Sequence, residues 1–475
     1  MGPYKKFDRF NILINPSLQE VYHHLITLAE EFAVLGHMSA AKTLISLLLS
    51  QDASQDHHRE IQYLKYAFAE SNIWPDEITL ESRREEELEG IVMLEPGVSP
   101  SDSGSEMGDT DYARFHDLLY TDENCDGMDG RPAMTRSAAL ADALAIAIDM
   151  ASEDNPDIQE IEKDKKVQKV LDRISRRMHS HHAAKCLTER RINWSLLATG
   201  ALARKIPVDL AKLDAFSEEV IATFKNRFEK GRQLHEGSIK ELLIELDRNT
   251  RNNSDASQYQ MEPVPETLFS APATDEQILA VERKLDIQLP DDYREYLKIS
   301  NGFGGEGLWN GYHLVAPLFG TDDLEWEEGF DIPIELHESV TAGWDLSFPD
   351  DLEWPSYEKE LLLFGRSDIF AVYFIPPDLT KKVLEAYSEA FSSSDISNDL
   401  KQQIHKSIAS QYGSWDEFQK LEWVAVSMDE GWPTAHGTFT QFLQDKVRES
   451  SRADSEGEAV SRWGSIAYSC MPDSS

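Results

Sequence analysis

The clearest hydrophobic pattern in the chain lies between residues 289 and 302 and predicts one short helix. Four side chains recur there at three- and four-residue spacing and form a face that can be buried: Tyr293, Tyr296, Leu297 and Ser300. Pro290 suits the first helical position, because the amide it lacks has no intrahelical partner there. Asn301 and Gly302 readily adopt the left-handed conformation that ends a helix, so we expect the helix to stop at this pair.

A second helix is predicted directly upstream. Thr274 and Gln277 have the spacing of a capping box, in which each side chain bonds the backbone amide of the other residue. An apolar stripe follows at helical spacing, formed by Ile278, Val281 and Leu285. Residues 274–300 are therefore expected to form two capped helices in succession.

Apolar and aromatic runs farther along predict a small sheet. Strand candidates separated by turn signals cover residues 308–315, 361–364, 369–375 and 423–428. A closing helix is predicted at 438–447, and an inserted pair of helices at 378–420. Helices combined with a small, mostly antiparallel sheet indicate an α+β domain.

The chain before residue 250 has helical apolar spacing in two regions. Residues 1–80 predict a helical-hairpin region, and residues 136–250 predict an all-α domain of four or five helices. Together with the α+β region, this gives a chain of at least two folded domains.

Acidic and polar stretches separate these regions. Residues 81–135 are rich in Asp, Glu, Ser and Gly, a composition that buries too little apolar area to offset chain entropy. We interpret them as a disordered acidic linker that contains one candidate docking helix at 112–120. Residues 251–272 are expected to be a second linker, and residues 449–475 a disordered tail.

The run TDEQILAVERKLDIQLPDDYREYLKISNGFGG resembles the opening of the SUKH superfamily. The positions that match the family pattern in order and spacing are Glu282, Leu289, Pro290, Tyr293, Leu297, Asn301 and Gly302. The family includes yeast cell-wall assembly regulators and bacterial toxin-immunity proteins, and the resemblance covers roughly residues 273–448. It implies an α+β domain that binds other proteins through its sheet face and adjoining loops, with mainly structural roles for the matched residues.

The charge of the chain limits its partners. There are 86 acidic and 46 basic residues, so the formal net charge is −40. Such a surface repels phosphate and anionic lipid, and general binding to nucleic acid or membranes is not expected. Proteins, especially basic ones, are the partners that the charge favours. Without a signal-peptide core or a long apolar run, the sequence predicts a cytoplasmic or nuclear protein.

One basic stretch interrupts the acidic chain. Residues 163–191 hold ten Lys or Arg against three acids, and Lys165, Lys169, Arg173 and Arg177 recur every four residues along one helical face. Contact with the acidic segments or with a partner protein is the favoured interpretation. RNA binding or an import signal is the alternative.

Aromatic residues and carboxylates gather after the predicted helices. The candidate protein-binding surface consists of Trp309, Tyr312, Trp326, Trp344 and Trp354. Acidic side chains at residues 322–331 accompany them. Clustered aromatics with an acidic rim are typical of protein-binding surfaces, and paired carboxylates beside aromatics also occur in sugar-cleaving sites.

We find no motif that assigns an enzymatic activity. The chain has no nucleophile elbow, no convincing Ser-His-Asp order and no dinucleotide fingerprint. Its three cysteines and its histidine pairs lack the spacing of a metal site. We therefore expect no catalytic, cofactor-binding or metal-binding residues.

Three functional hypotheses remain. The first is an intracellular protein-interaction scaffold or regulator, by resemblance in fungal cell-wall assembly or morphogenesis. The second is a toxin-neutralising binder of the immunity type, and the third is a carbohydrate-active enzyme.

The helix pattern makes a testable prediction. Leu297→Asp should unfold the α+β domain, because an unpaired charge buried against an apolar face costs more than about 3 kcal/mol. Circular dichroism and thermal melting would measure the loss. A variant with an unchanged melting curve would contradict the helix assignment.

Overall fold

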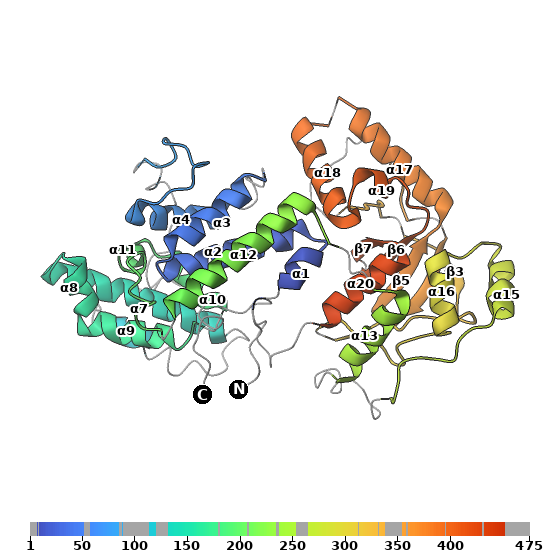
Figure 1. The fold of residues 1–475 in the computed structure, drawn as a ribbon, viewed down its shortest axis with the longest axis horizontal. Coiled ribbons are helices and arrows are strands. Elements are labelled where there is room, and N and C mark those ends of the chain that lie inside the picture. Colours follow the sequence, from blue (N-terminus) through green and yellow to red (C-terminus); the bar gives the residue numbers. More distant parts are fainter. Residues whose placement is uncertain are drawn as a thin grey trace, which may run out of the picture. The chain divides into compact units, whose positions relative to one another are not determined.

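The chain divides into two compact units in the computed structural model (Figure 1). The N-terminal unit comprises residues 20–229 with 1–12 and 455–475, and the C-terminal unit comprises residues 230–454 with 13–19. The structure describes residues 7, 9–51, 58–84, 88, 114–119, 132–178, 181–206, 209–233, 237–252, 265–311, 313–330, 332–337, 354–357, 360–394, 396–429 and 432–451.

The described part of the N-terminal unit is helical, as the apolar spacing predicts. Its helices are α1 (Arg9–Ile14, which continues into the C-terminal unit), α2 (Leu18–Val34), α3 (Met38–Leu49), α4 (His58–Ser71), α7 (Pro132–Asp154), α8 (Ile158–Lys163), α9 (Lys165–Ser175), α10 (His181–Thr188), the 3-10 turn η1 (Arg191–Asn193), α11 (Trp194–Leu197) and α12 (Leu210–Lys230). The long helix α7 packs against α9 and α10. Gly36, with φ of 75°, makes the turn between α2 and α3, where a Cβ would lie 2.5 Å from the Cα of Gly200.

Part of the predicted acidic linker is folded. Residues 114–119 form a helical turn whose Phe115 and Leu119 side chains are buried. The Arg173 guanidinium on α9 donates a 3.0 Å hydrogen bond to the Leu119 carbonyl. This helical turn lies inside the candidate docking helix predicted at 112–120, and one arginine of the basic stretch is bonded to it. Most of the remaining linker lies outside the described residues.

The C-terminal unit combines helices with two antiparallel sheets. Its helices are α13 (Ile239–Asn252), α15 (Asp275–Leu285), α16 (Asp291–Ile299), α17 (Pro377–Ser392), α18 (Asn398–Tyr412), α19 (Trp415–Phe418) and α20 (Phe439–Ser450). The strands are β1 (Leu308–Trp309), β2 (Leu314–Val315), β3 (Glu325–Glu327), β4 (Leu361–Arg366), β5 (Phe370–Ile375), β6 (Val424–Asp429) and β7 (Trp432–Gly437). No helix in the described ranges of either unit is long and apolar enough to cross a membrane.

The main sheet has five strands in the order β3-β4-β5-β6-β7, and every neighbouring pair is antiparallel. Both faces are apolar. Leu362, Phe364 and Phe374 belong to one core, which α13, α15, α16 and α20 cover. The alternate residues, such as Leu363 and Tyr373, belong to a second core that α17 and α18 cover. The helices predicted over 378–420 thus form the layer over one face of the sheet.

The structure corrects several strand and helix limits. The predicted strand at 308–315 is a short hairpin, β1 with β2, and β3 and β7 were not predicted. Pro290 is the N-cap of α16 and not its first residue. The helix ends at Ile299 because Ser300 is extended, so the prediction that Asn301 and Gly302 end it is wrong.

Asn301 instead joins two loops. Its side-chain Oδ1 accepts a hydrogen bond from the Thr321 backbone amide at 2.7 Å. Its backbone amide donates to the Ala271 carbonyl at 3.1 Å. A Cβ on Gly320 would lie 2.6 Å from the Asn301 carbonyl oxygen, so the approach requires glycine. The asparagine therefore has a structural role, although not the one expected.

The described residues 237–252 and 265–273, predicted as the end of a helical domain and part of a linker, belong to the C-terminal unit. Helix α13 packs beside α20, as Figure 1 shows, and its leucines lie in the same core. Leu268 is buried in this core, and its amide donates to Asp247 of α13 at 2.8 Å. Helix α13 and residues 265–273 therefore share the core of the α+β domain.

The second core contains a buried histidine that makes stability depend on pH. Burial lowers the pKa of His337 from 6.5 to about 4. The unfolded ring takes up a proton below pH 6.5, whereas the folded ring does so only near pH 4. The free energy of unfolding therefore falls as the pH decreases from 6.5 to about 4, and this contribution changes no further at lower pH. We expect His337 to contribute about 3 kcal/mol of this loss.

Urea unfolding at pH 7 and pH 4.5 would test this. His337→Asn, which keeps an acceptor near Nδ1, should show a smaller loss than the parent chain. The exposed His405 of α18 is the matched control, and His405→Asn should behave like the parent. Equal pH dependence in all three proteins would contradict the prediction.

Candidate functional site

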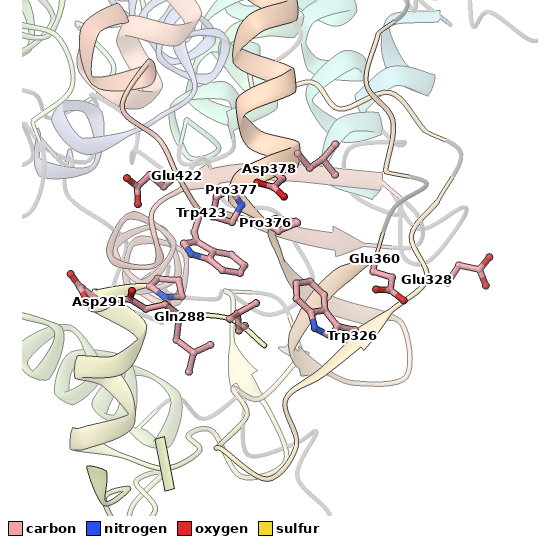
Figure 2. Close-up of a pocket in the computed structure, with 14 residues that line it drawn as sticks. Gln288, Asp291, Trp326, Glu328, Glu360, Pro376, Pro377, Asp378, Glu422 and Trp423 are labelled. Atoms are coloured by element: carbon pink, nitrogen blue, oxygen red, sulfur yellow. The ribbon is translucent and has the colours of Figure 1, made fainter. Parts of the chain in front are cut away.

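An acidic groove of about 1060 Å³ opens at one end of the main sheet (Figure 2). Its lining combines five carboxylates, two tryptophans and three prolines with four other residues: Asp291, Glu328, Glu360, Asp378, Glu422, Trp326, Trp423, Pro290, Pro376, Pro377, Ile287, Gln288, Leu289 and Leu379. We call this site the acidic groove.

The antiparallel topology brings these residues together. In an antiparallel sheet, the start of one strand lies beside the end of the next. Glu328 follows β3, Glu360 precedes β4, Pro376 follows β5 and Trp423 precedes β6. The connection from α15 to α16 supplies the remaining wall. The groove thus gathers residues separated by more than a hundred positions in the sequence.

The two tryptophans are half-buried and held from behind. The Trp326 indole N–H donates to the Leu285 carbonyl at 3.2 Å. The Trp423 ring meets Phe374 edge-on, with centroids 6.0 Å apart. Both rings pack against the first core and also line the groove. Fixed aromatic rings of this kind offer apolar area at little entropic cost.

The carboxylates of the groove have little compensation by cations. Asp291 makes a distant contact of 3.9 Å with Arg294. Within the described parts of the chain, no ion pair is formed by Glu328, Glu360, Asp378 or Glu422, and no lining residue is a lysine, arginine or histidine. Figure 2 shows the carboxylates around the two indoles.

The structure separates the predicted aromatic surface. Trp326 lines the groove, but Trp309 is fully buried and cannot form part of a surface. Trp354 packs in the second core, where its indole donates to Ile334 at 2.9 Å. Tyr312 and Trp344 lie outside the described residues.

Several groove residues were missed because they come from strand ends far apart in the sequence. Trp423 was expected only as the start of a strand, and Glu422, Asp378 and Glu360 were not singled out. The sequence did contain one signal: Glu328, Glu360 and Glu422 each lie within two residues of a strand end. The Pro376-Pro377 pair lies at the end of a fourth strand. That signal acquires meaning only when the strand order is known.

The matched family residues have structural contacts. Glu282 accepts the Leu289 amide at 3.0 Å and lies 3.5 Å from the Arg294 guanidinium, so it ties α15 to the start of α16. Tyr293 is buried and donates to the Phe319 carbonyl at 2.9 Å. Leu297 is fully buried. Leu289 and Pro290 also line the groove.

The carboxylates at 322–331 do not form one site. Trp326 of β3 and Glu328, which follows the strand, line the groove, and alternation places Glu325 and Glu327 on the opposite face. Glu327 accepts hydrogen bonds from Arg366 and from Tyr373. The Arg366 hydrogen bond lowers the pKa of Glu327, whereas a general acid requires a raised pKa.

A partly buried trio resembles the arrangement of a serine hydrolase. Asp445 Oδ2 lies 2.9 Å from His436 Nδ1, and His436 Nε2 lies 2.8 Å from Ser427 Oγ. Burial opposes ionisation of Asp445, but Arg232 and His436 outweigh it and hold the pKa of Asp445 well below its usual range. The ionised carboxylate only accepts, so His436 Nδ1 donates to it. The sequence suggested no such grouping.

This trio lacks the other parts of a hydrolase site. Ser427 lies within β6, paired with Val372 on one side and Thr434 on the other. The backbone amides beside it serve the two strand ladders, so the described residues offer no free donors for an oxyanion. The second oxygen of Asp445 accepts from Arg232 at 2.6 Å.

Arg232 shows what the trio does instead. This buried arginine donates to the Ile14 carbonyl at 2.7 Å and to the Gln411 carbonyl at 3.0 Å, as well as to Asp445. It thereby joins residues 13–19, the end of α18 and α20 within one unit. We interpret the network as a structural clamp, which we call the Arg232 clamp.

The comparisons with known proteins identify one domain. Residues 272–384 match the SMI1 / KNR4 family (SUKH-1), and this range contains α15, α16, β1–β5 and half of α17. The match ends before β6, β7 and α20, although these elements complete the same unit. Neither the curated proteins nor the solved structures give a match.

The clamp gives a prediction about stability. Asp445→Asn leaves the buried Arg232 without a counter-ion and should cost about 3–5 kcal/mol. Ser427→Ala removes one hydrogen bond and should cost about 1 kcal/mol. Hydrogen exchange of peptides from β7 and α20 would measure both effects locally.

The matched control is Asp378→Asn, because Asp378 is exposed and makes no ion pair with a described residue. It should leave the exchange of these peptides unchanged. If the β7 and α20 peptides exchanged no faster in the Asp445→Asn variant than in the Ser427→Ala variant, the structural interpretation of the clamp would be incorrect.

Proposed function

We propose that the SUKH-type domain of this chain is a protein-binding module and that the acidic groove is its partner-binding surface. The observation that carries this proposal is one concave site with two half-buried tryptophans among five carboxylates. Energetic centres of protein interfaces are enriched in tryptophan, and a polar rim surrounds them. The groove has this composition.

In this proposal the chain acts as an intracellular scaffold or regulator, not as an enzyme. The separation of the β3 carboxylates on two strand faces supports this role, as does the ladder pairing around Ser427. Two compact units with their own cores suit a scaffold, because each unit can offer its own surface.

The resemblance to cell-wall assembly regulators suggests the setting. We propose fungal cell-wall assembly or morphogenesis signalling, an analogy at the level of the family, since one fold supports many functions. The alternative is a toxin-neutralising binder, in which the same carboxylates would mask a basic toxin. The identity of the protein bound in the groove separates the two.

Site-specific photo-crosslinking tests the proposal. A photoreactive phenylalanine analogue replaces Gln288, an exposed residue that lines the groove. In native lysate, we expect a defined set of protein adducts that mass spectrometry can identify. The yield of these adducts should fall in a Trp423→Ala background, because the tryptophan supplies apolar contact area for the partner.

The matched control places the same analogue at Leu279 of α15, which is 42% exposed and outside the groove. It should give none of the groove-specific adducts. Identical adducts from both positions, or none from Gln288, would overturn the assignment of the groove as the binding surface.

A further inference from the structure

We propose that the acidic groove binds an extended, arginine-rich segment of a partner protein. The guanidinium groups would lie between the carboxylates and over the two indole rings. This inference rests on the proposed function and adds to it the chemical class of the partner. Four features of the groove lead to it.

The first feature is the balance of hydrogen-bonding groups. Five lining side chains are carboxylates, which only accept when ionised. The side-chain donors are Gln288 and the two indoles, and the Trp326 N–H is already bonded to Leu285. Pro290, Pro376 and Pro377 have no backbone N–H. A ligand that fits such a lining must supply donors, as guanidinium and ammonium groups do.

The second feature is charge that the protein leaves unbalanced. Asp291 and Asp378 lie in the first turns of α16 and α17, where the helix dipole favours a carboxylate. Glu328, Glu360 and Glu422 have no such compensation and form no ion pair with any described cation. These three are therefore the carboxylates that most favour a cationic ligand.

The third feature is the pair of tryptophans. Cations bind over the face of an indole more strongly than over other aromatic rings. Arginine does so better than lysine, because its planar guanidinium stacks on the ring while its N–H groups reach carboxylates. Trp423 directly follows Glu422, and Trp326 lies two positions before Glu328, so the lining holds a carboxylate within two residues of each ring in the sequence.

The fourth feature is the size and spread of the site. A volume of about 1060 Å³ lies at the upper end of the range for small-ligand sites, about 300–1,000 Å³, and leaves room for a peptide segment. Within the described residues, no group of three His, Cys, Asp or Glu side chains is close enough to hold a metal ion. The five acids come from five separate segments of the chain and surround the two indoles, an arrangement that suits several separate cations. A peptide chain carries cations with this separation, whereas sugar hydroxyls need donors and acceptors together.

Fluorescence anisotropy with the full-length chain tests the inference. The probes are fluorescein-labelled peptides of equal length in which glycine alternates with arginine, lysine or glutamine. We expect the arginine peptide to bind at low salt, more weakly as salt rises, and the glutamine peptide not to bind. The lysine peptide should bind more weakly than the arginine peptide, and Trp423→Leu should reduce this difference.

Two triple variants with the same change of charge distinguish the groove from the acidic surface in general. Glu328→Gln with Glu360→Gln and Glu422→Gln should weaken binding of the arginine peptide at least about tenfold, which corresponds to about 1.4 kcal/mol. Asp322→Asn with Asp323→Asn and Glu325→Gln removes three exposed acids outside the groove. This control should retain the affinity of the parent within about twofold.

Equal weakening in both triple variants would overturn the inference, because the peptide would then sense only net charge. Spermine is a small polycation. If it bound as tightly as the arginine peptide and lost affinity in the groove variant alone, the inference that the ligand is a peptide segment would be overturned. Groove-specific crosslinks from Gln288 without any binding of the arginine peptide would overturn the partner class and leave the proposed function standing.

Discussion

The need to cover an apolar sheet on both faces determines the organisation of the C-terminal unit. A strand residue points to the face opposite its neighbours, and in β4 to β6 both sets of positions are apolar. One set is covered by α13, α15, α16 and α20, and the other by α17 and α18. Both faces are buried in this way, so a surface site on this sheet has to lie at the ends of its strands. The acidic groove lies at one of these ends.

The Arg232 clamp shows how far the folded unit extends beyond the matched family range. Residues 13–19, Arg232, α13, α18 and α20 are linked by buried hydrogen bonds and a shared core, although the family match covers only 272–384. A buried charge is tolerated only with its partners in place. A fragment limited to 273–448 would lose Arg232 and leave Asp445 without its counter-ion. Functional work on the groove therefore requires the longer chain.

Charge has three different roles in this molecule. Asp445 and Arg232 lie in the interior and fix the positions of segments that are distant in the sequence. The carboxylates of the groove lie at the surface, where they add little to stability, and in the proposed function they select the partner. The third role is local. Arg173 of the basic stretch on α9 donates a hydrogen bond to the Leu119 carbonyl and thereby contacts a short helical turn.

Local patterns in the sequence determined much of the fold. The spacing of Tyr293, Tyr296 and Leu297 predicted α16, the Thr274 capping box is present in α15, and the apolar runs located β4, β5 and β6. These features depend on residues a few positions apart. Strand β3 escaped prediction because it has only three residues, and β7 escaped because its sequence WPTAHG has little apolar alternation; both depend on pairing with β4 and β6.

The site itself was decided by tertiary structure. Trp309 and Trp326 look alike in the sequence, yet one is buried and the other lines the groove. Ser427, His436 and Asp445 form a network only because β6, β7 and α20 are neighbours. The sequence by itself determined the helices, the fold class, the excess of acid and the resemblance to the SUKH superfamily. The order of the strands decided which acids and tryptophans meet, because that order brings together residues that local spacing cannot relate.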